Sequence, residues 1–121
     1  MFNYKEIDST DCEFIPVAEV EDLPIGERLF LEIDNKPIVV INIAGGLFAI
    51  GDVCSHDDGP VGEGEIEGNE IICPRHGARF DLRSGEAVGL PAVVDIPAYP
   101  VRVVGGQIEI GLPAEKQMKG T

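Results

Sequence analysis

The sequence predicts an all-β fold, an antiparallel sandwich or small barrel, on two observations. Short β-branched and aliphatic runs recur between turn-forming residues, and nine prolines leave little room for a long helix. A region of about residues 52–91 is rich in glycine and poor in regular pattern, which is typical of a subdomain inserted into a β-scaffold. The 121 residues fit one domain, residues 1–121, with a core of its own.

The first predicted strand is RLFLEI, residues 28–33. Its apolar side chains alternate in part with polar ones, so that Leu29, Leu31 and Ile33 share one face. This alternation predicts a half-buried strand. The Asp-Asn-Lys-Pro sequence of residues 34–37 predicts the turn that follows it.

Two hairpins are expected next along the chain, each with a Gly-Gly turn. In the first, the β-branched run 38–43 leads through an Ala-Gly-Gly segment into the run 47–50. In the second, the runs 101–104 and 107–110 are joined by two glycines alone. A glycine pair between β-branched runs is a strong local signal for a tight hairpin, because glycine adopts the left-handed backbone that such turns require.

Little helix is expected elsewhere, because prolines interrupt most of the remaining chain. The segment 17–23 (VAEVEDL) predicts a turn or a short helix before the proline that follows it. Residues 114–121, beyond the last predicted strand, are expected to form a flexible tail. The sequence contains no internal repeat and no linker between domains.

The charge of the chain excludes two classes of partner. Nine basic and 22 acidic residues give a formal net charge of −13, which repels nucleic acid and anionic membrane surfaces. This charge serves either solubility or docking to a basic partner. The most apolar segment, residues 37–50, is too short and too interrupted to span a bilayer. The amino terminus has no signal-peptide pattern, so we expect a cytoplasmic protein.

Cysteine and histidine are concentrated in one stretch of the chain. Cys54 and His56 are separated by one residue, Cys73 and His76 by two, and both histidines of the chain lie here. Two thiolates and two imidazoles suit iron or zinc and not a hard ion such as magnesium. Because each half supplies one cysteine and one histidine, two similar loops are expected to approach a metal centre. The third cysteine, Cys12, is then left without a disulfide partner, which indicates a reducing compartment.

The segments DVCSHDDGP (52–60) and IICPRHGARFDLRSGE (71–86) resemble the ligand boxes of the Rieske proteins. In that family a [2Fe-2S] cluster has one iron held by two cysteines and the other by two histidines. The resemblance implies that Cys54, His56, Cys73 and His76 are the ligands of one such cluster, within a cluster-binding subdomain of about residues 52–91. It also implies that Pro74 and Gly77 lie beside the cluster and that Pro91 belongs to a loop that covers it. An ordinary turn before a strand is the other interpretation of Pro91.

A closed Cys2His2 zinc site is the structural alternative, because the same four ligands can hold one tetrahedral ion. Two features of the sequence favour the iron-sulfur interpretation. Only Ser55 separates Cys54 from His56, whereas zinc modules space their ligand pairs more widely and pair cysteine with cysteine. The interval between the two boxes also contains no predicted zinc-finger helix.

Residues next to the ligands predict a low reduction potential. High-potential Rieske proteins add a cysteine to each box, and the resulting disulfide ties the two loops together. The matching positions in this chain are Gly59 and Arg75. The same proteins place hydroxyl donors to the cluster sulfurs at positions that match Ala78 and Phe80, which have none. Arg75 itself either offsets the charge of the reduced cluster or points to solvent.

The low-potential members are soluble Rieske-type ferredoxins of bacterial aromatic-ring dioxygenase systems, and this chain resembles them. The resemblance implies a monomeric one-electron carrier, not itself an enzyme. It would accept electrons from a flavin-containing NAD(P)H reductase and pass them to a terminal non-heme iron oxygenase. Two alternatives stay open. One is an accessory subunit like the small subunit of nitrite reductase, although the ligands are commonly lost in that family. The other is a zinc-stabilised interaction module.

Overall fold

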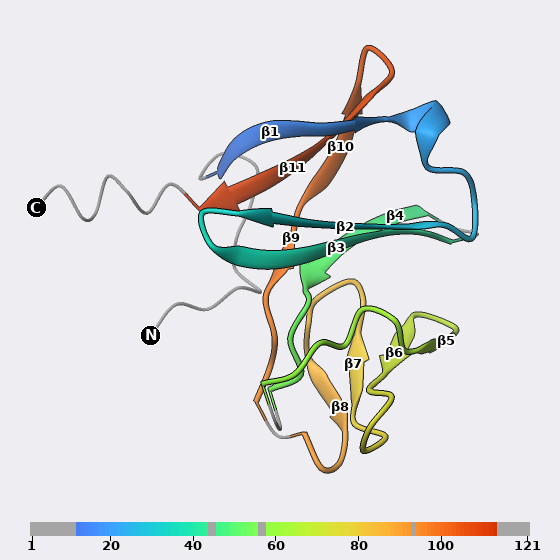
Figure 1. The fold of residues 1–121 in the computed structure, drawn as a ribbon, viewed down its shortest axis with the longest axis vertical. Helices are drawn as coiled ribbons and strands as arrows, with labels where there is room; N and C mark the ends of the chain where they lie inside the picture. The colour runs from blue at the N-terminus through green and yellow to red at the C-terminus, as the bar shows by residue number, and fades with distance from the viewer. Residues whose placement is uncertain (1–11, 44–45, 56–57, 93, 114–121) are drawn as a thin grey trace, which may run out of the picture.

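The protein is described by a computed structural model over residues 12–43, 46–55, 58–92 and 94–113. All strand pairs in these residues are antiparallel, and they form three sheets. Figure 1 shows two sheets one above the other in the upper half of the molecule and the third sheet below them. The prediction of an all-β antiparallel fold is therefore confirmed.

The uppermost sheet in Figure 1 has the strand order β1-β11-β10. Its strands are β1 (Cys12–Glu19), β10 (Val101–Val104) and β11 (Gln107–Pro113). The predicted hairpin of β10 and β11 is present, and Gly105 and Gly106 form its turn with φ angles of 58° and 82°. Strand β1 was not predicted, because its only partner, β11, lies about 90 positions away in the sequence.

The middle sheet has the order β2-β3-β4-β9. Its strands are β2 (Arg28–Ile33), β3 (Lys36–Ile43), β4 (Gly46–Gly51) and β9 (Ala98–Tyr99). The predicted strands 28–33, 38–43 and 47–50 are all present here. The turn between β2 and β3 is shorter than predicted, because Asp34 and Asn35 alone take the left-handed backbone of a two-residue hairpin turn, at φ 54° and 66°. The tip of the β3-β4 hairpin, residues 44–45, lies outside the described residues.

The lower sheet is a meander with the order β5-β6-β7-β8. Its strands are β5 (Glu65–Glu67), β6 (Glu70–Ile72), β7 (Arg79–Asp81) and β8 (Ala87–Gly89). The sequence analysis predicted no individual strand in this region, since strands of three residues are too short to show a periodic pattern. The segment that contains the lower sheet begins after β4 and ends before β9, and these two strands pair with each other.

The core has two parts that meet at β3, which is buried on both faces. Ile38 and Val40 pack toward the β1-β11-β10 sheet, in a cluster with Ile108 and Ile110. Val39, on the opposite face, belongs to the second cluster, which contains the side chains of the lower part of the molecule. A continuous β-branched run at β3 is the sequence signature of a strand buried on both sides.

Two further expectations can be compared with the structure. The predicted helix or turn at 17–23 is smaller than expected: a single-turn 3-10 helix covers Val20–Asp22, and Val17 belongs to β1. The pairing of β1 with β11 continues to Glu19, so the first part of the segment 17–23 is a strand and not a helix. The predicted tail at 114–121 lies outside the described residues. No helix within the described part of the chain is long and apolar enough to cross a membrane.

Candidate metal centre

Two of the four predicted ligands are buried thiols in the same part of the core. The side chains of Cys54 and Cys73 are 0% and 1% exposed. Both belong to one buried cluster with Val61 and Phe80, at the interface of the middle and lower sheets. Cys54 lies three residues after β4, and Cys73 directly follows β6. The two boxes, well separated in the sequence, are therefore brought together by the fold.

The loops that follow the two cysteines have the same backbone hydrogen bonds. We call residues 54–59 the Cys54 loop and residues 73–78 the Cys73 loop. In each loop the cysteine N–H donates to the carbonyl oxygen five residues later, at 2.7 Å for Gly59 and 2.7 Å for Ala78. The residue before that acceptor donates back to the cysteine carbonyl, from Asp58 at 2.7 Å and from Gly77 at 3.0 Å. The predicted pair of similar loops is confirmed at the level of the backbone.

Each loop also turns at a residue with left-handed backbone. The φ angle is 64° at Asp58 and 78° at Gly77, and these two residues occupy matching positions. Aspartate is one of the few residues other than glycine that adopts this conformation readily, because its short side chain can hydrogen-bond locally. The matching turns close each loop tightly after its cysteine.

The predicted histidine ligands differ in what the structure describes. His76 lies within the Cys73 loop and is exposed to solvent. His56 and the neighbouring Asp57 lie outside the described residues. Of the residues predicted beside the metal centre, Pro74, Gly77 and Pro91 are all exposed, and the Leu90–Pro91 peptide bond is cis.

An arginine connects the Cys54 loop and the Cys73 loop. The Arg75 guanidinium donates to the Pro60 carbonyl oxygen at 2.7 Å. It also covers Gly59 so closely that a Cβ atom built at Gly59 would lie 2.7 Å from Nη2 and 2.8 Å from Cζ of Arg75. Arg75 is exposed to solvent, and its guanidinium lies on the neighbouring loop; that it offsets the charge of the reduced cluster stays a prediction.

The segment after the Cys54 loop is fixed by two charged side chains that the sequence analysis did not single out. The Asp52 carboxylate accepts from the N–H groups of Val61 and Gly62, at 2.9 and 2.6 Å. From β2, the Arg28 guanidinium donates to the carbonyl oxygens of Gly62 and Gly64, at 2.6 and 2.7 Å. A strand of the middle sheet thereby holds the segment that leads out of the loop.

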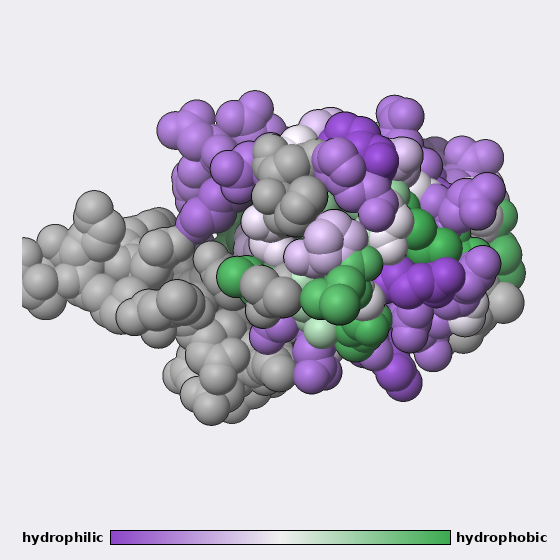
Figure 2. All heavy atoms as spheres, turned by 90° about the horizontal axis from the view of Figure 1, so that it is seen from below, coloured by the Kyte–Doolittle hydropathy of each residue, from purple (hydrophilic) through white to green (hydrophobic). Residues whose placement is uncertain are grey.

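The loop that contains Pro91 is attached to the Cys54 loop. The Ser55 hydroxyl donates to the Val94 carbonyl oxygen, and the Asp95 carboxylate accepts from the Ala87 N–H at 2.9 Å. Three loops therefore meet at one end of the molecule, the lower end in Figure 1. Figure 2 views the molecule from this end and shows hydrophobic side chains among hydrophilic ones. The exposed hydrophobic residues of the Pro91 region are Leu90, Val94 and Val88, which are 80%, 57% and 43% exposed.

The two positions that match the hydroxyl donors of high-potential Rieske proteins, Ala78 and Phe80, carry no hydroxyl group. Ala78 and Phe80 are both 0% exposed, and Phe80 packs in the same cluster as the two cysteines. The Ala78 carbonyl closes the Cys73 loop. Neither side chain can donate a hydrogen bond to a sulfur atom.

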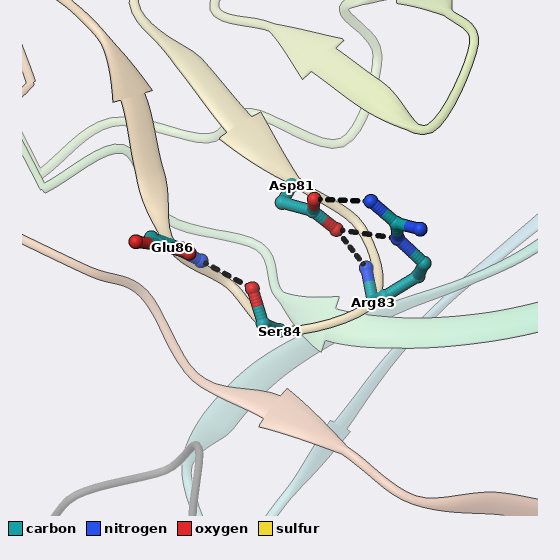
Figure 3. Close-up of polar contacts among 4 residues, drawn as sticks. All are labelled: Asp81, Arg83, Ser84 and Glu86. Atoms are coloured by element: carbon teal, nitrogen blue, oxygen red, sulfur yellow. Dashed lines mark hydrogen bonds and ion pairs between the residues drawn. The ribbon is translucent and has the colours of Figure 1, made fainter.

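The charged groups at the far end of β7 have a structural role. Arg83 donates to Asp81 through its backbone N–H, Nε and Nη2, at 2.8, 3.1 and 2.8 Å, and the Ser84 hydroxyl accepts from the Glu86 N–H at 3.2 Å (Figure 3). These hydrogen bonds from Arg83 lower the pKa of Asp81 below its ordinary value. Arg79 does not join this group. It pairs with Glu67 and Glu70 across the sheet.

Comparison with known proteins places the chain in a family. Residues 13–100 match the model of the Rieske [2Fe-2S] domain. The chain is 43% identical over 101 residues to the ferredoxin subunit of 3-phenylpropionate/cinnamic acid dioxygenase from Escherichia coli and Shigella flexneri, which covers 82% of this chain and 93% of the relative.

The chain belongs to the Rieske [2Fe-2S] domain family.

Two solved structures agree with this assignment. The ferredoxin of carbazole 1,9a-dioxygenase from Nocardioides aromaticivorans superimposes with a TM-score of 0.74 at 31% identity, over 80% of this chain and 95% of that one. A complex of reduced oxygenase and oxidized ferredoxin in carbazole 1,9a-dioxygenase contains a chain with a TM-score of 0.74 at 24% identity, over 81% of this chain and 92% of that one. The second likeness concerns the fold alone.

The donor set of this Rieske protein fits a [2Fe-2S] cluster. Cys54 and Cys73 supply two thiols inside one buried cluster, and His76 supplies an imidazole at the surface. A Rieske cluster separates its ligands in this way, with both cysteines on one iron and both histidines on the other. The described residues, which do not include His56, contain no group of three or more His, Cys, Asp or Glu side chains placed to hold a metal ion. The cofactor of this family is the [2Fe-2S] cluster, and its ferredoxin members transfer electrons rather than catalyse a reaction.

Proposed function

We propose that this protein is the ferredoxin of an aromatic-ring dioxygenase system, with Cys54, His56, Cys73 and His76 as the cluster ligands. The observation that carries this proposal is the pair of buried cysteines at the start of two loops with the same hydrogen bonds. When bound, a Rieske cluster takes up and releases a single electron. The relative at 43% identity is the ferredoxin subunit of a dioxygenase, which supports the same role here.

The side chains around the ligands divide the site into a dry side and an accessible side. Val61 and Phe80 are fully buried beside Cys54 and Cys73, so they keep water from the sulfur atoms. His76 is exposed, and its imidazole edge is the part of the ligand set that another protein can approach closely. The electron therefore enters and leaves through the histidine side.

We place the docking surface for the oxygenase at this end of the molecule. The exposed side chains of Val88, Leu90 and Val94 supply apolar contact area beside the Cys54 loop, to which Ser55 ties their loop. Apolar patches of this kind, rimmed by polar groups, are typical of protein interaction sites. The complex of oxygenase and ferredoxin in carbazole 1,9a-dioxygenase supports the class of partner. A flavin-containing NAD(P)H reductase completes the proposed chain of electron carriers.

We further propose a low reduction potential, near the bottom of the Rieske range. Hydroxyl groups that bond to cluster sulfurs stabilise the reduced state, and Ala78 and Phe80 supply none. The acidic chain, at −13, also disfavours an added electron. The same charge and the three cysteines of the chain support a monomeric protein of the cytoplasm.

The ligand assignment can be tested by metal analysis, absorption and electron paramagnetic resonance. We expect a brown protein that, after reduction, gives the rhombic signal of a mixed Cys/His [2Fe-2S] centre. Cys54→Ser and Cys73→Ser should each abolish the colour. Cys12→Ser is the matched control, because it removes the one cysteine outside the proposed ligand set, and it should stay brown. A colourless protein that carries zinc would refute the proposal.

The partners can be tested by stopped-flow absorption. A reductase of the 3-phenylpropionate dioxygenase system should reduce the protein with NADH, and the oxygenase of that system should then reoxidise it. Replacing Leu90 by Asp should slow reoxidation by the oxygenase at least about tenfold, since it puts a charge into an apolar contact. The equivalent change at Ile25 is the control, because Ile25 is 73% exposed and lies in the segment between the 3-10 helix and β2, in the upper half of Figure 1. Equal effects of the two changes would exclude the proposed docking surface.

A further inference from the structure

The side chain of Arg75, in the Cys73 loop, contacts the end of the Cys54 loop. Its guanidinium reaches from the Cys73 loop to the end of the Cys54 loop, where it donates to the Pro60 carbonyl at 2.7 Å. The same group lies against Gly59, and the three atoms nearest to a Cβ built there all belong to Arg75, at 2.7, 2.8 and 3.2 Å. Gly59 has no left-handed φ angle, so its lack of a side chain serves space rather than backbone conformation.

Among the described residues, the backbone N–H groups of Cys54, Asp58, Cys73 and Gly77 each donate to a carbonyl oxygen of their own loop. The bonds from Cys54 and Asp58 close the Cys54 loop on itself, and those from Cys73 and Gly77 close the Cys73 loop in the same way. A ligand set taken half from each loop requires that the loops keep their relative position to within a fraction of an ångström. A side chain that joins them therefore acts on the geometry of the whole set.

We propose that Arg75 is a positioning residue that clasps the Cys73 loop to the Cys54 loop at Gly59 and Pro60, and that it also places a permanent positive charge beside the bound cluster. The inference rests on the proposed function in one respect, that both loops hold the cluster. The guanidinium suits this role because it stays charged and its planar fork can lie flat on a glycine while it donates to a carbonyl.

The clasp predicts a specific coupling between two substitutions. Arg75→Ala removes the contact, and Gly59→Ala displaces the guanidinium because the added Cβ would occupy its place. Each change should speed loss of the cluster to a chelator about fivefold, which corresponds to about 1 kcal/mol for a lost hydrogen bond. The double variant should be no faster than Arg75→Ala alone, since the added methyl group then meets no arginine. Independent effects would instead multiply to about 25-fold.

The charge can be separated from the clasp by the reduction potential. Arg75→Ala should lower the midpoint potential, because the reduced cluster loses a nearby positive charge. Arg75→Lys keeps the charge but not the planar fork, so it should restore most of the potential and little of the resistance to chelator. Arg83→Ala is the matched control, an exposed arginine paired with Asp81 away from the cysteine loops, and it should change neither quantity.

Two results would overturn the clasp. One is a double variant whose rate of cluster loss is the product of the single effects. The other is Gly59→Ala that loses its cluster at the wild-type rate while its circular dichroism stays native. Both results are read from the brown holoprotein, so they leave the proposed function standing. A colourless wild-type protein would instead refute the proposed function and the inference together.

Discussion

Asp52 should be among the most sensitive polar positions outside the ligand set. Its carboxylate accepts two backbone N–H groups, from Val61 and Gly62, and it is half-buried two residues before Cys54. A hydrogen bond to a charged group contributes roughly 1.5–3 kcal/mol, so the two together contribute about 3–6 kcal/mol. Water can replace part of this at a half-buried site. We therefore expect Asp52→Ala to lower the free energy of unfolding by about 2–4 kcal/mol.

Urea unfolding of the oxidised holoprotein measures this effect, with far-UV circular dichroism and cluster absorbance recorded together. For a slope of about 2 kcal/mol per molar urea, the midpoint should fall by about 1–2 M. Asp52→Asn keeps an oxygen acceptor but loses the charge, so it should fall between wild type and Asp52→Ala. Glu32→Gln, which removes an exposed carboxylate from β2, is the control. An Asp52→Ala midpoint within about 0.2 M of wild type would refute the reasoning.

Three further predictions concern separate parts of the molecule. Gly64→Ala should destabilise the protein by at least about 3 kcal/mol, because its Cβ would lie 1.8 Å from the backbone oxygen of Ile72. Gly89→Ala should cost less in the same thermal unfolding assay, because its Cβ would lie 3.0 Å from the nearest atom, the Cβ of Arg79. Because Arg83 lowers the pKa of Asp81, the stability that Asp81 adds is present above pH about 3.8 and is lost as the pH falls further. The difference in melting temperature between wild type and Asp81→Asn should therefore disappear in acid. A difference that grows in acid would contradict the assignment. Ala78→Ser should raise the midpoint potential in voltammetry, and an unchanged value would show that this position does not explain the low potential.

Much of the fold could be predicted because its central strands carry strong local signals. The alternation of β2 and the β-branched run of β3 gave both strands nearly to their ends, and the Gly-Gly pair gave the hairpin of β10 and β11. Strand β1 carries no such signal. Its sequence contains Pro16 at an irregularity of the pairing, and only its partner β11 makes it a strand. The three-residue strands of the lower sheet are likewise decided by tertiary hydrogen bonds.

The candidate site could be predicted by chemistry but not by geometry. The spacing of cysteine and histidine indicated the ligands, and the fold brings Cys54 and Cys73 into one buried cluster. The contacts that hold the loops were not visible, because Arg28 lies about 35 positions before the carbonyl groups it binds. Arg75 was singled out for its charge and, with Gly59, as a position that matches the disulfide of high-potential Rieske proteins. Its contact with Gly59 depends on where two distant loops meet, which no local pattern encodes.

The closed backbone of the two cysteine loops has a consequence for protein engineering. When the loops are matched by their hydrogen bonds, the cysteine is the only identical residue, and the histidines occupy different positions, since His56 corresponds to Arg75. The two backbone hydrogen bonds that close each loop therefore do not determine which position of the loop carries the histidine. In engineering such a loop, the backbone hydrogen bonds and the position of the histidine are therefore two separate choices, since the histidine is at the third position of one loop and at the fourth position of the other.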